Sequence, residues 1–196
     1  MEISQKKPTY GLEDLESVLL SETQIANRVS ELAKEILSHY GGRDITIICV
    51  LSGAIVFTSD LIRNLKLPTR LDCLRSDSYG SSTKPNDPPR ISSPLKNDIE
   101  NRHVLLVDDI LDTGNTLSEL IEHLAQSKPA SLRTCVLLDK KERRQLKIKA
   151  DYVGFNVPDA FVVGYGLDFA EHYRSLPCIG VLKTEFQKGS YFQCGC

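Results

Sequence analysis

The sequence predicts an α/β fold, in which a mostly parallel, twisted sheet is flanked by helices. Short apolar runs of the kind that form buried strands alternate along the chain with longer segments whose apolar residues recur at helical spacing. The chain has 196 residues, of which 41% are hydrophobic and 26% charged, so it can bury a sizeable core. No internal repeat or interdomain linker is evident, and we expect residues 1–196 to form a single domain.

The first expected helix has a capping box at its start, with Ser21 followed three residues later by Gln24. Apolar residues then recur at helical spacing until the pair Gly41-Gly42 ends the pattern. The run Ile45–Leu51 is almost wholly apolar, as expected of a parallel strand that is covered on both faces. Further helices are expected at residues 55–65 and from 117 onward, and further strands at residues 71–79, 104–107, 131–139 and within 151–169.

Charge and composition exclude several classes of protein. The formal net charge of -2 gives no sign of a nucleic-acid-binding or membrane-surface protein. No apolar run approaches the roughly 18 residues that cross a bilayer, and the polar start of the chain lacks the apolar core of a signal peptide. The six cysteines are scattered, and the terminal pair Cys194 and Cys196 is only a weak metal or redox signal. We therefore expect a reduced, cytoplasmic protein with no membrane partner.

One long stretch lacks any periodicity. After Tyr79 the chain is rich in Gly, Ser and Pro up to Asp98. A stretch of this length inside a domain is usually a functional lid or a disordered segment. We expect a flexible active-site loop at about residues 79–98, with Ser78 and Tyr79 at its start.

The stretch VLLVDDILDTGNTL, residues 104–117, contains most of the chemical information. The carboxylates of Asp108 and Asp109 come at the end of a strand, at the edge where open α/β sheets bind ligands. Residues 112–116 then enter a helix whose first N–H groups, together with a glycine and two threonine hydroxyls, suit a phosphate. Because carboxylates would repel a bare phosphate, we expect a ligand that also has hydroxyl groups or a bound Mg²⁺, such as a sugar phosphate.

Two simpler interpretations of this stretch stay open. Asp109 can be a helix cap, with Asp108 solvated. The letters LLVDD also resemble the start of phospho-accepting receiver domains. In those domains the acidic pair lies near the N-terminus, whereas here it lies past the midpoint and a phosphate-type turn follows at once, so we give this interpretation little weight.

The same stretch resembles the phosphoribosyl-pyrophosphate (PRPP) signature of type I phosphoribosyltransferases. The segments SDSYGSS, LLDKK (residues 137–141) and DYVGFNVPDAFVVGYGLDFAEHYRSLP (residues 151–177) narrow the resemblance to the hypoxanthine-guanine phosphoribosyltransferases, over residues 25–181. The resemblance implies the type I phosphoribosyltransferase fold, with a small hood subdomain built from the chain ends. It also implies Mg²⁺-dependent transfer of the phosphoribosyl group of PRPP to N9 of hypoxanthine or guanine, which yields IMP or GMP and pyrophosphate in purine salvage.

The resemblance assigns roles to residues of the signature. Asp108 and Asp109 match the acidic pair that binds the ribose hydroxyls, and together with Asp168 they are the expected metal ligands. Asp112 matches the carboxylate placed near purine N7, the candidate general base or acid. The 5′-phosphate loop corresponds to Thr113, Gly114, Asn115 and Thr116.

Further roles follow from the resemblance outside the signature. Lys140 matches the lysine that donates to the purine 6-oxo group, Phe161 the ring stacked on the base, and Val162 a backbone contact to the edge of the base. The expected pyrophosphate contacts are Ser52, Gly53 and Arg174, and the peptide before residue 52 is often a non-proline cis peptide in the family.

Simpler interpretations also exist for these residues. By itself Phe161 could be a core residue. The basic run after Lys140 could be a solvated surface, which we expect for Arg143, Arg144, Lys147 and Lys149.

The expected partners are small molecules, PRPP and a 6-oxopurine, with Mg²⁺ as cofactor, and a homodimer or homotetramer is implied by the resemblance. A rival from another class is a PRPP- or nucleotide-sensing regulator that binds nucleic acid on the same scaffold. Its only candidate basic face is the segment at residues 140–149, and the net charge of -2 argues against it. A transferase for xanthine or another base would belong to the same reaction class.

Overall fold

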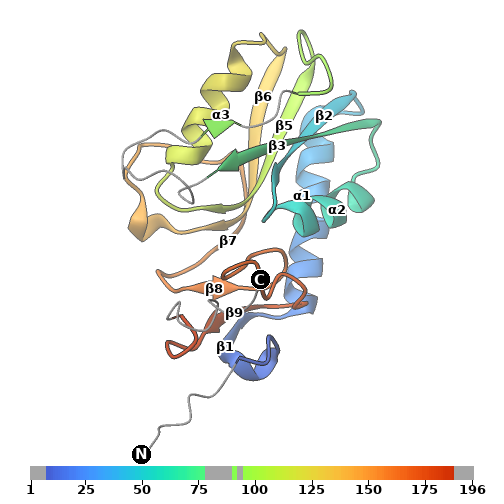
Figure 1. Ribbon diagram of the computed structural model, residues 1–196. Helices are drawn as coiled ribbons and strands as arrows, with labels where there is room; N and C mark the ends of the chain where they lie inside the picture. The colour runs from blue at the N-terminus through green and yellow to red at the C-terminus, as the bar shows by residue number, and fades with distance from the viewer. Residues whose placement is uncertain (1–7, 78–89, 92–94, 188–196) are drawn as a thin grey trace, which may run out of the picture. The chain divides into compact units, whose positions relative to one another are not determined.

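The computed structural model describes residues 8–77, 90–91 and 95–187. The chain divides into two compact units (Figure 1). Unit 1 is formed by both chain ends, Met1–Ile25 and Ala160–Cys196, and unit 2 is the continuous segment Ala26–Asp159.

Unit 2 is built on a six-stranded sheet with the order β4-β3-β2-β5-β6-β7. The β4 strand pairs antiparallel with β3, and all other neighbours are parallel. This sheet confirms the predicted mostly parallel α/β fold. Its strands are β2 (Ile45–Leu51), β3 (Thr69–Asp77), β4 (Arg90–Ile91), β5 (His103–Leu111), β6 (Ser131–Asp139) and β7 (Tyr152–Asn156).

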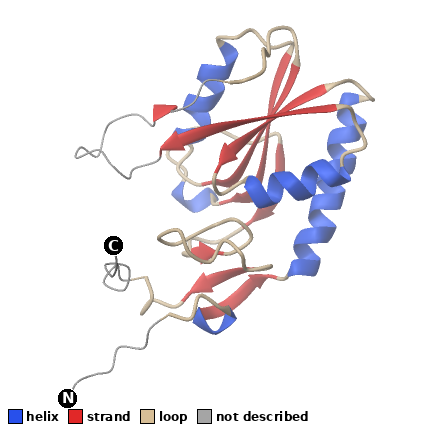
Figure 2. Cartoon of the chain, turned by 45° about the vertical axis from the view of Figure 1, so that its right-hand side comes forward, coloured by secondary structure: helices blue, strands red, loops and turns tan. Residues whose placement is uncertain are grey.

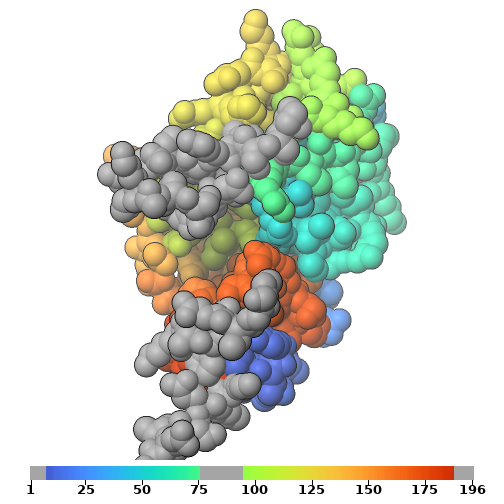
Figure 3. Space-filling view, viewed as in Figure 1, coloured from blue at the N-terminus to red at the C-terminus, as the bar shows by residue number. Residues whose placement is uncertain are grey.

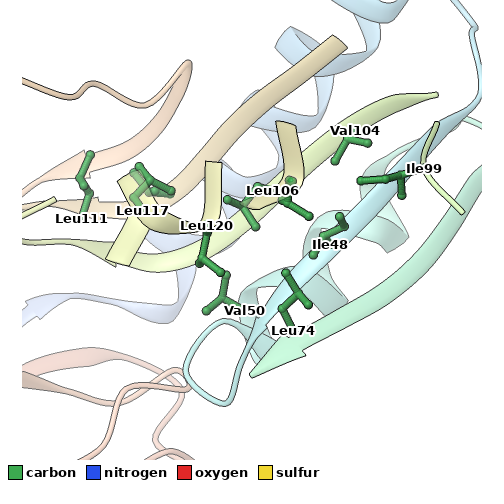
Figure 4. Packing of buried hydrophobic residues seen from close by; sticks show 11 residues of the cluster. Ile48, Val50, Leu74, Ile99, Val104, Leu106, Leu111, Leu117 and Leu120 are labelled. Carbon is green, nitrogen blue, oxygen red and sulfur yellow. The ribbon is translucent and has the colours of Figure 1, made fainter. Parts of the chain in front are cut away.

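Helices cover both faces of this sheet. Figure 2 shows α3 (Asn115–Ala125) on one face, and α2 (Ile55–Asn64) with α1 (Glu22–Tyr40) on the other. On the α3 side, apolar side chains of the helix meet those of the strands in a buried cluster (Figure 4). The cluster includes Leu117, Leu120 and Leu124 from α3, and Ile48, Val50, Leu74, Leu106 and Val136 from the sheet. At roughly 25 cal/mol per Å² of apolar surface, this burial stabilises the packing of α3 on the sheet.

The start of α1 confirms the predicted capping box. The Ser21 backbone N–H donates to Gln24 Oε1 (2.9 Å), and the Gln24 N–H donates to Ser21 Oγ (3.3 Å). Two orphan donors of the first helical turn are satisfied in this way. Farther along α1, Arg28 donates to the carbonyl oxygens of Val153 (2.8 Å) and Gly154 (2.9 Å), which ties the helix to β7.

Strand β5 is longer than the sequence predicts. We expected it to end at Val107, but it continues to Leu111. Up to Val107 it pairs with both β2 and β6, and beyond that point the printed pairing continues with β6 alone. Hydrogen bonding to β6 therefore keeps the backbone extended through Asp108 and Asp109. The two carboxylates therefore lie within the last part of β5, beyond the point where its pairing with β2 ends.

Unit 1 contains a three-stranded antiparallel sheet with the order β1-β9-β8. The strands are β1 (Leu15–Leu20), β8 (Val162–Val163) and β9 (Ile179–Leu182), and a short 3-10 helix, Leu12–Asp14, precedes β1. The two ends of the chain thus lie side by side in one sheet, as the blue and orange-red surfaces of Figure 3 show. A separate apolar cluster, which includes Leu15, Val163, Leu176 and Phe186, stabilises this unit.

A buried carboxylate organises the N-terminal part of unit 1. Asp14 is 1% exposed, and its Oδ2 accepts hydrogen bonds from the backbone N–H groups of Thr9 (2.8 Å) and Tyr10 (2.7 Å) and from the Tyr173 hydroxyl (3.0 Å). Burial and this hydrogen bond raise the pKa of Tyr173. This arrangement could not be predicted from the sequence, because Asp14 and Tyr173 are far apart along the chain.

The expected flexible loop at about residues 79–98, with Ser78 and Tyr79, falls mostly outside the described residues. We expected this stretch to have no regular structure. Within the described part, however, Arg90 and Ile91 pair with Asp77 and Ser76 of β3. Its end is anchored, because the Asn97 backbone N–H donates to Asp72 Oδ2 (2.7 Å). Among the described residues, no helix is long and apolar enough to cross a membrane.

Candidate active site

The acidic pair at the end of β5 is held by its own backbone. Asp108 is 6% exposed, and its Oδ1 accepts the N–H of Asp109 (2.9 Å). Asp109 Oδ1 in turn accepts the N–H of Ile110 (2.9 Å). These local bonds fix the orientation of both carboxylates at the end of the strand.

The environment of Asp108 disfavours a negative charge. Burial, and secondly the adjacent charge of Asp109, raise the pKa of the Asp108 carboxyl well above its usual range. A cation or a hydroxyl donor placed against the pair would relieve this unfavourable situation. Simple helix capping by Asp109 does not describe the pair, since both residues belong to β5.

The loop after β2 approaches the acidic pair closely. A β-carbon built on Gly53 would lie 1.7 Å from Asp109 Oδ2, so any side chain here would force the Asp109 carboxylate to move. The preceding peptide bond, Leu51–Ser52, is cis, the form that the family often has there. Since β2 and β5 are parallel neighbours, their carboxyl ends bring Ser52 and Gly53 to the same edge of the sheet as Asp108 and Asp109.

The phosphate-type turn takes the predicted conformation at the start of α3. Gly114 precedes the helix with φ = 95°, a left-handed value that favours glycine. A β-carbon there would also lie 2.6 Å from Ile148 Cγ2. The Thr113 hydroxyl accepts the Asn115 N–H (3.4 Å), and the first helical N–H groups lie at the positive end of the α3 dipole.

Asp112 stands at the entrance to this turn with an unusual environment. Its Oδ1 is buried and has no hydrogen-bond partner among the described residues. Its Oδ2 lies 3.4 Å from Arg143 Nη1, and Arg143 also lies 3.9 Å from Asp159 Oδ1. A buried carboxylate oxygen without a partner is costly, and a bound donor would remove this cost.

A largely buried arginine holds the turn in place. Arg144 donates from Nε to the Asp112 carbonyl (2.8 Å), from Nη1 to the Ile148 carbonyl (2.7 Å) and from Nη2 to the Leu111 carbonyl (3.2 Å). It also forms an ion pair with Asp139, and the two side chains are 15% and 8% exposed. The expectation of a solvated Arg144 was therefore wrong.

The remaining basic residues of this segment differ from Arg144. Lys147 and Lys149 are exposed, as expected. Arg143 is half-exposed, but it pairs with two carboxylates, so it is not simply a solvated side chain.

Lys140 is a buried lysine close to acidic groups. It is 6% exposed, and its backbone N–H donates to the Leu111 carbonyl (3.0 Å), so it is fixed beside the end of β5. Burial lowers the pKa of Lys140, while the charges of Asp112 and Asp159 counteract part of this effect. Such a cation is suited to a ligand oxygen that enters from outside.

In unit 1 the predicted base-contacting residues lie at the start of β8. Phe161 is 42% exposed, and its ring meets Phe169 edge-to-face at 5.3 Å between centroids. The alternative that Phe161 is a core residue was therefore wrong, since a large part of its side chain is exposed. Val162 is buried and pairs with Val181 of β9, which fixes the backbone at this point.

The predicted metal ligand Asp168 and the predicted pyrophosphate contact Arg174 form an ion pair in unit 1. Arg174 Nη1 lies 3.0 Å from Asp168 Oδ1, and it also donates to the Gly166 carbonyl (2.8 Å). Asp168 Oδ2 accepts the N–H of Glu171 (2.9 Å). Both side chains are partly exposed, so each keeps access to solvent and to a ligand.

The donor set is compatible with Mg²⁺ bound together with a substrate. Among the described residues, no group of three or more His, Cys, Asp or Glu side chains is arranged to hold a metal ion. Mg²⁺ commonly uses one or two carboxylates together with substrate phosphates and water. The Asp108–Asp109 pair is such a partial ligand set, and burial raises the pKa of its Asp108 carboxyl.

The structure therefore brings together two groups of predicted residues within unit 2. Ser52 and Gly53 meet the acidic pair, and Asp112, the turn and Lys140 lie around the start of α3 and the end of β6. Sequence reasoning missed Arg144 and its partner Asp139. The position of Arg144 was a usable signal. It follows shortly after β6, and β6 ends at the ligand-binding edge of the sheet, so its long side chain can reach that edge.

The chain matches proteins of known family. A model of the phosphoribosyl transferase domain matches residues 17–170. The hypoxanthine-guanine phosphoribosyltransferase of Bacillus subtilis is 46% identical over 170 residues, which cover 87% of this chain and 94% of that protein.

Solved structures agree with this match. The structure of a hypoxanthine phosphoribosyltransferase from Staphylococcus aureus is similar with a TM-score of 0.85 and 41% identity, over 90% of this chain and 96% of that chain. A hypoxanthine phosphoribosyl transferase from Trypanosoma cruzi has a TM-score of 0.84 and 40% identity, over 90% and 95% of the two chains. That structure addresses the role of the C-terminal region in oligomeric state and enzymatic activity.

Proposed function

Since this chain belongs to the phosphoribosyltransferase family, with hypoxanthine-guanine phosphoribosyltransferases as its relatives, we propose that it transfers the 5-phosphoribosyl group of PRPP to N9 of hypoxanthine or guanine. The products are IMP or GMP and pyrophosphate, and the reaction is one of purine salvage. The comparisons give no support to the rival nucleic-acid-binding regulator.

The observation that carries this proposal is the environment of Asp112. Its buried Oδ1 has no partner among the described residues, and it lies directly before a helix start suited to a phosphate. A purine ring whose N7 carries or receives a proton would supply the missing partner. The phosphate held at the turn would place the sugar of the same substrate next to this carboxylate.

The sugar phosphate is bound by residues at the carboxyl ends of β2 and β5. Asp108 and Asp109 accept hydrogen bonds from the ribose hydroxyls, and Thr113, Gly114, Asn115 and Thr116 bind the 5′-phosphate. Ser52 and Gly53 bind pyrophosphate, and Arg174 adds a positive charge that stabilises this leaving group. The bond between C1 of the ribose and the pyrophosphate oxygen breaks, and pyrophosphate leaves with the bonding electrons. N9 of the purine forms the new bond to C1.

The base is recognised by donors and by stacking. Lys140 donates to the 6-oxo group, which distinguishes a 6-oxopurine from a 6-aminopurine because an ammonium group is donor-only. Phe161 stacks on the ring, and the backbone of Val162 contacts its edge. Asp112 accepts a proton from N7 as N9 bonds to the ribose, and it returns the proton in the reverse reaction.

We propose that Mg²⁺ binds together with the substrate. Asp108 and Asp109 supply the partial ligand set described above, and the resemblance assigns Asp168 as a further ligand. When bound, the ion would neutralise charge on the pyrophosphate. Asp168 supports this assignment because it keeps partial exposure despite its ion pair with Arg174.

The test is nucleotide formation from PRPP and Mg²⁺ with hypoxanthine, guanine, xanthine and adenine supplied separately. We expect activity with 6-oxopurines and none with adenine. The Asp112→Asn variant should lose roughly 10²–10⁴-fold in kcat, the usual contribution of a general acid or base. Absence of activity with every base, with PRPP binding intact, would overturn the proposal.

A matched control is Asp159→Asn. Asp112 and Asp159 both face Arg143, but Asp159 has no assigned role. If the two variants lose activity equally, the loss reflects the disturbed Arg143 ion pairs, and the catalytic role of Asp112 is wrong.

The proposal also covers the oligomeric state of the chain, its hood subdomain and its location in the cell. We infer a homodimer or homotetramer, which sedimentation of the full chain would test, and a hood that corresponds to unit 1. A cytoplasmic location fits the described cysteines, Cys49, Cys73, Cys135 and Cys178, all of which are free thiols.

A further inference from the structure

A cavity lies at the end of the sheet opposite to the acidic pair. The strands β2, β3 and β5 start there side by side, since Ile45 pairs with both Thr69 and His103. The volume of the cavity is about 430 Å³, which is within the usual range for small-molecule sites. We call it the edge cavity, and all its lining residues belong to unit 2.

Positive charge predominates around the edge cavity. Arg43, Arg70 and Arg102 line it, together with a single carboxylate, Asp44. The lining thus contains three arginines and one acidic residue. Arginine is always charged in proteins and binds phosphate groups with a planar fork of donors.

These arginines differ from most of the others that the structure describes. Six arginines elsewhere form ion pairs with carboxylates: Arg28, Arg63, Arg133, Arg143, Arg144 and Arg174. Within the described residues, none of the three arginines of the edge cavity has such a pair. The cavity thus gathers arginines whose charge is uncompensated.

One of the three arginines helps to shape the cavity. Arg43 donates from Nε to the Tyr40 carbonyl (2.8 Å) and from Nη2 to the His39 carbonyl (3.1 Å), so it caps the end of α1. The side chains of Arg70 and Arg102 make no hydrogen bond or ion pair with the described residues, and they keep their donors for a ligand.

A histidine adds a further polar group. His103 Nδ1 lies 2.8 Å from Ser131 Oγ, and the ring meets Tyr40 edge-to-face at 5.9 Å between centroids. These contacts hold the ring in place beside the arginines. Its second ring nitrogen is a hydrogen-bonding group for the ligand.

We propose that the edge cavity is a second anion site, which binds a small phosphate-bearing ligand with at least two negative charges. A ligand with a single charge would leave the arginines undercompensated, and the volume of the cavity is that of a small-molecule site. Two sources of small ligand carry such a charge, a free polyphosphate and the phosphate ester of a nucleotide. The site stands independently of the proposed catalytic function.

The test is NMR of the ¹⁵N-labelled full chain titrated with inorganic pyrophosphate and, separately, with GMP. We expect saturable shifts of the backbone amides of Thr46, Thr69 and Arg102. The amides of Gly114 and Asn115 report the candidate active site in the same spectra, so binding at the two ends of the sheet is resolved. The probe that saturates the edge amides at the lower concentration identifies the source, polyphosphate or phosphate ester.

The double variant Arg70→Gln/Arg102→Gln should raise the Kd at the edge amides at least tenfold and leave the response of Gly114 unchanged. The control is Arg63→Gln, an exposed arginine of α2 that is paired with Asp60, and it should bind as the wild type does. The proposal is wrong if the edge amides do not saturate, if sulfate at equal ionic strength shifts them equally, or if the double variant binds as tightly as the wild type.

Discussion

Asp109 and Gly53 are in direct contact across the ends of two parallel strands, so close that a β-carbon at Gly53 would overlap Asp109 Oδ2. The absence of a side chain at residue 53 is therefore what allows the carboxylate to occupy its position. The predicted ribose contact, Asp109, therefore depends on the glycine of the predicted pyrophosphate contact, Gly53.

Gly53→Ala should displace the Asp109 carboxylate and raise the KM for PRPP at least tenfold, or about 1.4 kcal/mol. Steady-state kinetics at saturating base would measure this change. Gly41→Ala is the control, because Gly41 has φ = 58° and no atom within 4 Å of an added β-carbon. It should cost about 1 kcal/mol of stability through its left-handed backbone and leave the KM unchanged. Equal KM values for the two variants would contradict the prediction.

Asp108→Asn should stabilise the fold and weaken activity. Burial raises the pKa of the Asp108 carboxyl above 3.8, so the folded chain retains a proton that the unfolded chain has released. The contribution of this group to the free energy of unfolding thus falls as the pH rises from about 3.8 through the raised pKa. Asparagine keeps an oxygen that can accept the Asp109 N–H.

We expect the Asp108→Asn variant to gain roughly 0.5–2 kcal/mol at pH 8 and to gain less at pH 4, in urea unfolding at both pH values. A difference that does not depend on pH would show that the buried charge is not the cause.

Arg144→Lys should loosen the phosphate-type turn. Lysine keeps the positive charge but cannot reproduce the fork that contacts the carbonyl oxygens of Leu111, Asp112 and Ile148. We expect a loss of about 2–3 kcal/mol in the free energy of unfolding and a several-fold higher KM for PRPP. Lys147→Gln, an exposed neighbour, should change stability by less than about 0.5 kcal/mol. Similar losses for both variants would argue against the proposed role of Arg144.

Asp14→Asn should destabilise unit 1. Three donors converge on Asp14 Oδ2, and a neutral amide satisfies them less well than a carboxylate. We expect a loss of about 1–3 kcal/mol, measured by urea unfolding, while Glu16→Gln on the exposed side of β1 should have little effect. An unchanged midpoint for Asp14→Asn would show that these bonds contribute no net stability.

The sequence predicted the parts of the fold that depend on local patterns. The capping box at Ser21 and Gln24, the buried run Ile45–Leu51 and the turn before α3 all follow from short-range preferences. The acidic pair and the glycine turn were recognisable for the same reason, since their chemistry is contained in a few consecutive residues. The continuation of β5 through the acidic pair was not recognisable, because it is imposed by hydrogen bonds to β6.

The sequence by itself thus determined the α/β class, the order of the main elements and the residues at the phosphate-type turn. Only the tertiary structure decided that Arg144 is a buried clamp, that Phe161 is exposed, that Asp112 has an oxygen without a partner among the described residues, and that three arginines meet at the edge cavity. The physical reason is that burial, charge compensation and packing depend on residues brought together from distant parts of the chain. A helix or strand preference, in contrast, is a property of neighbouring residues.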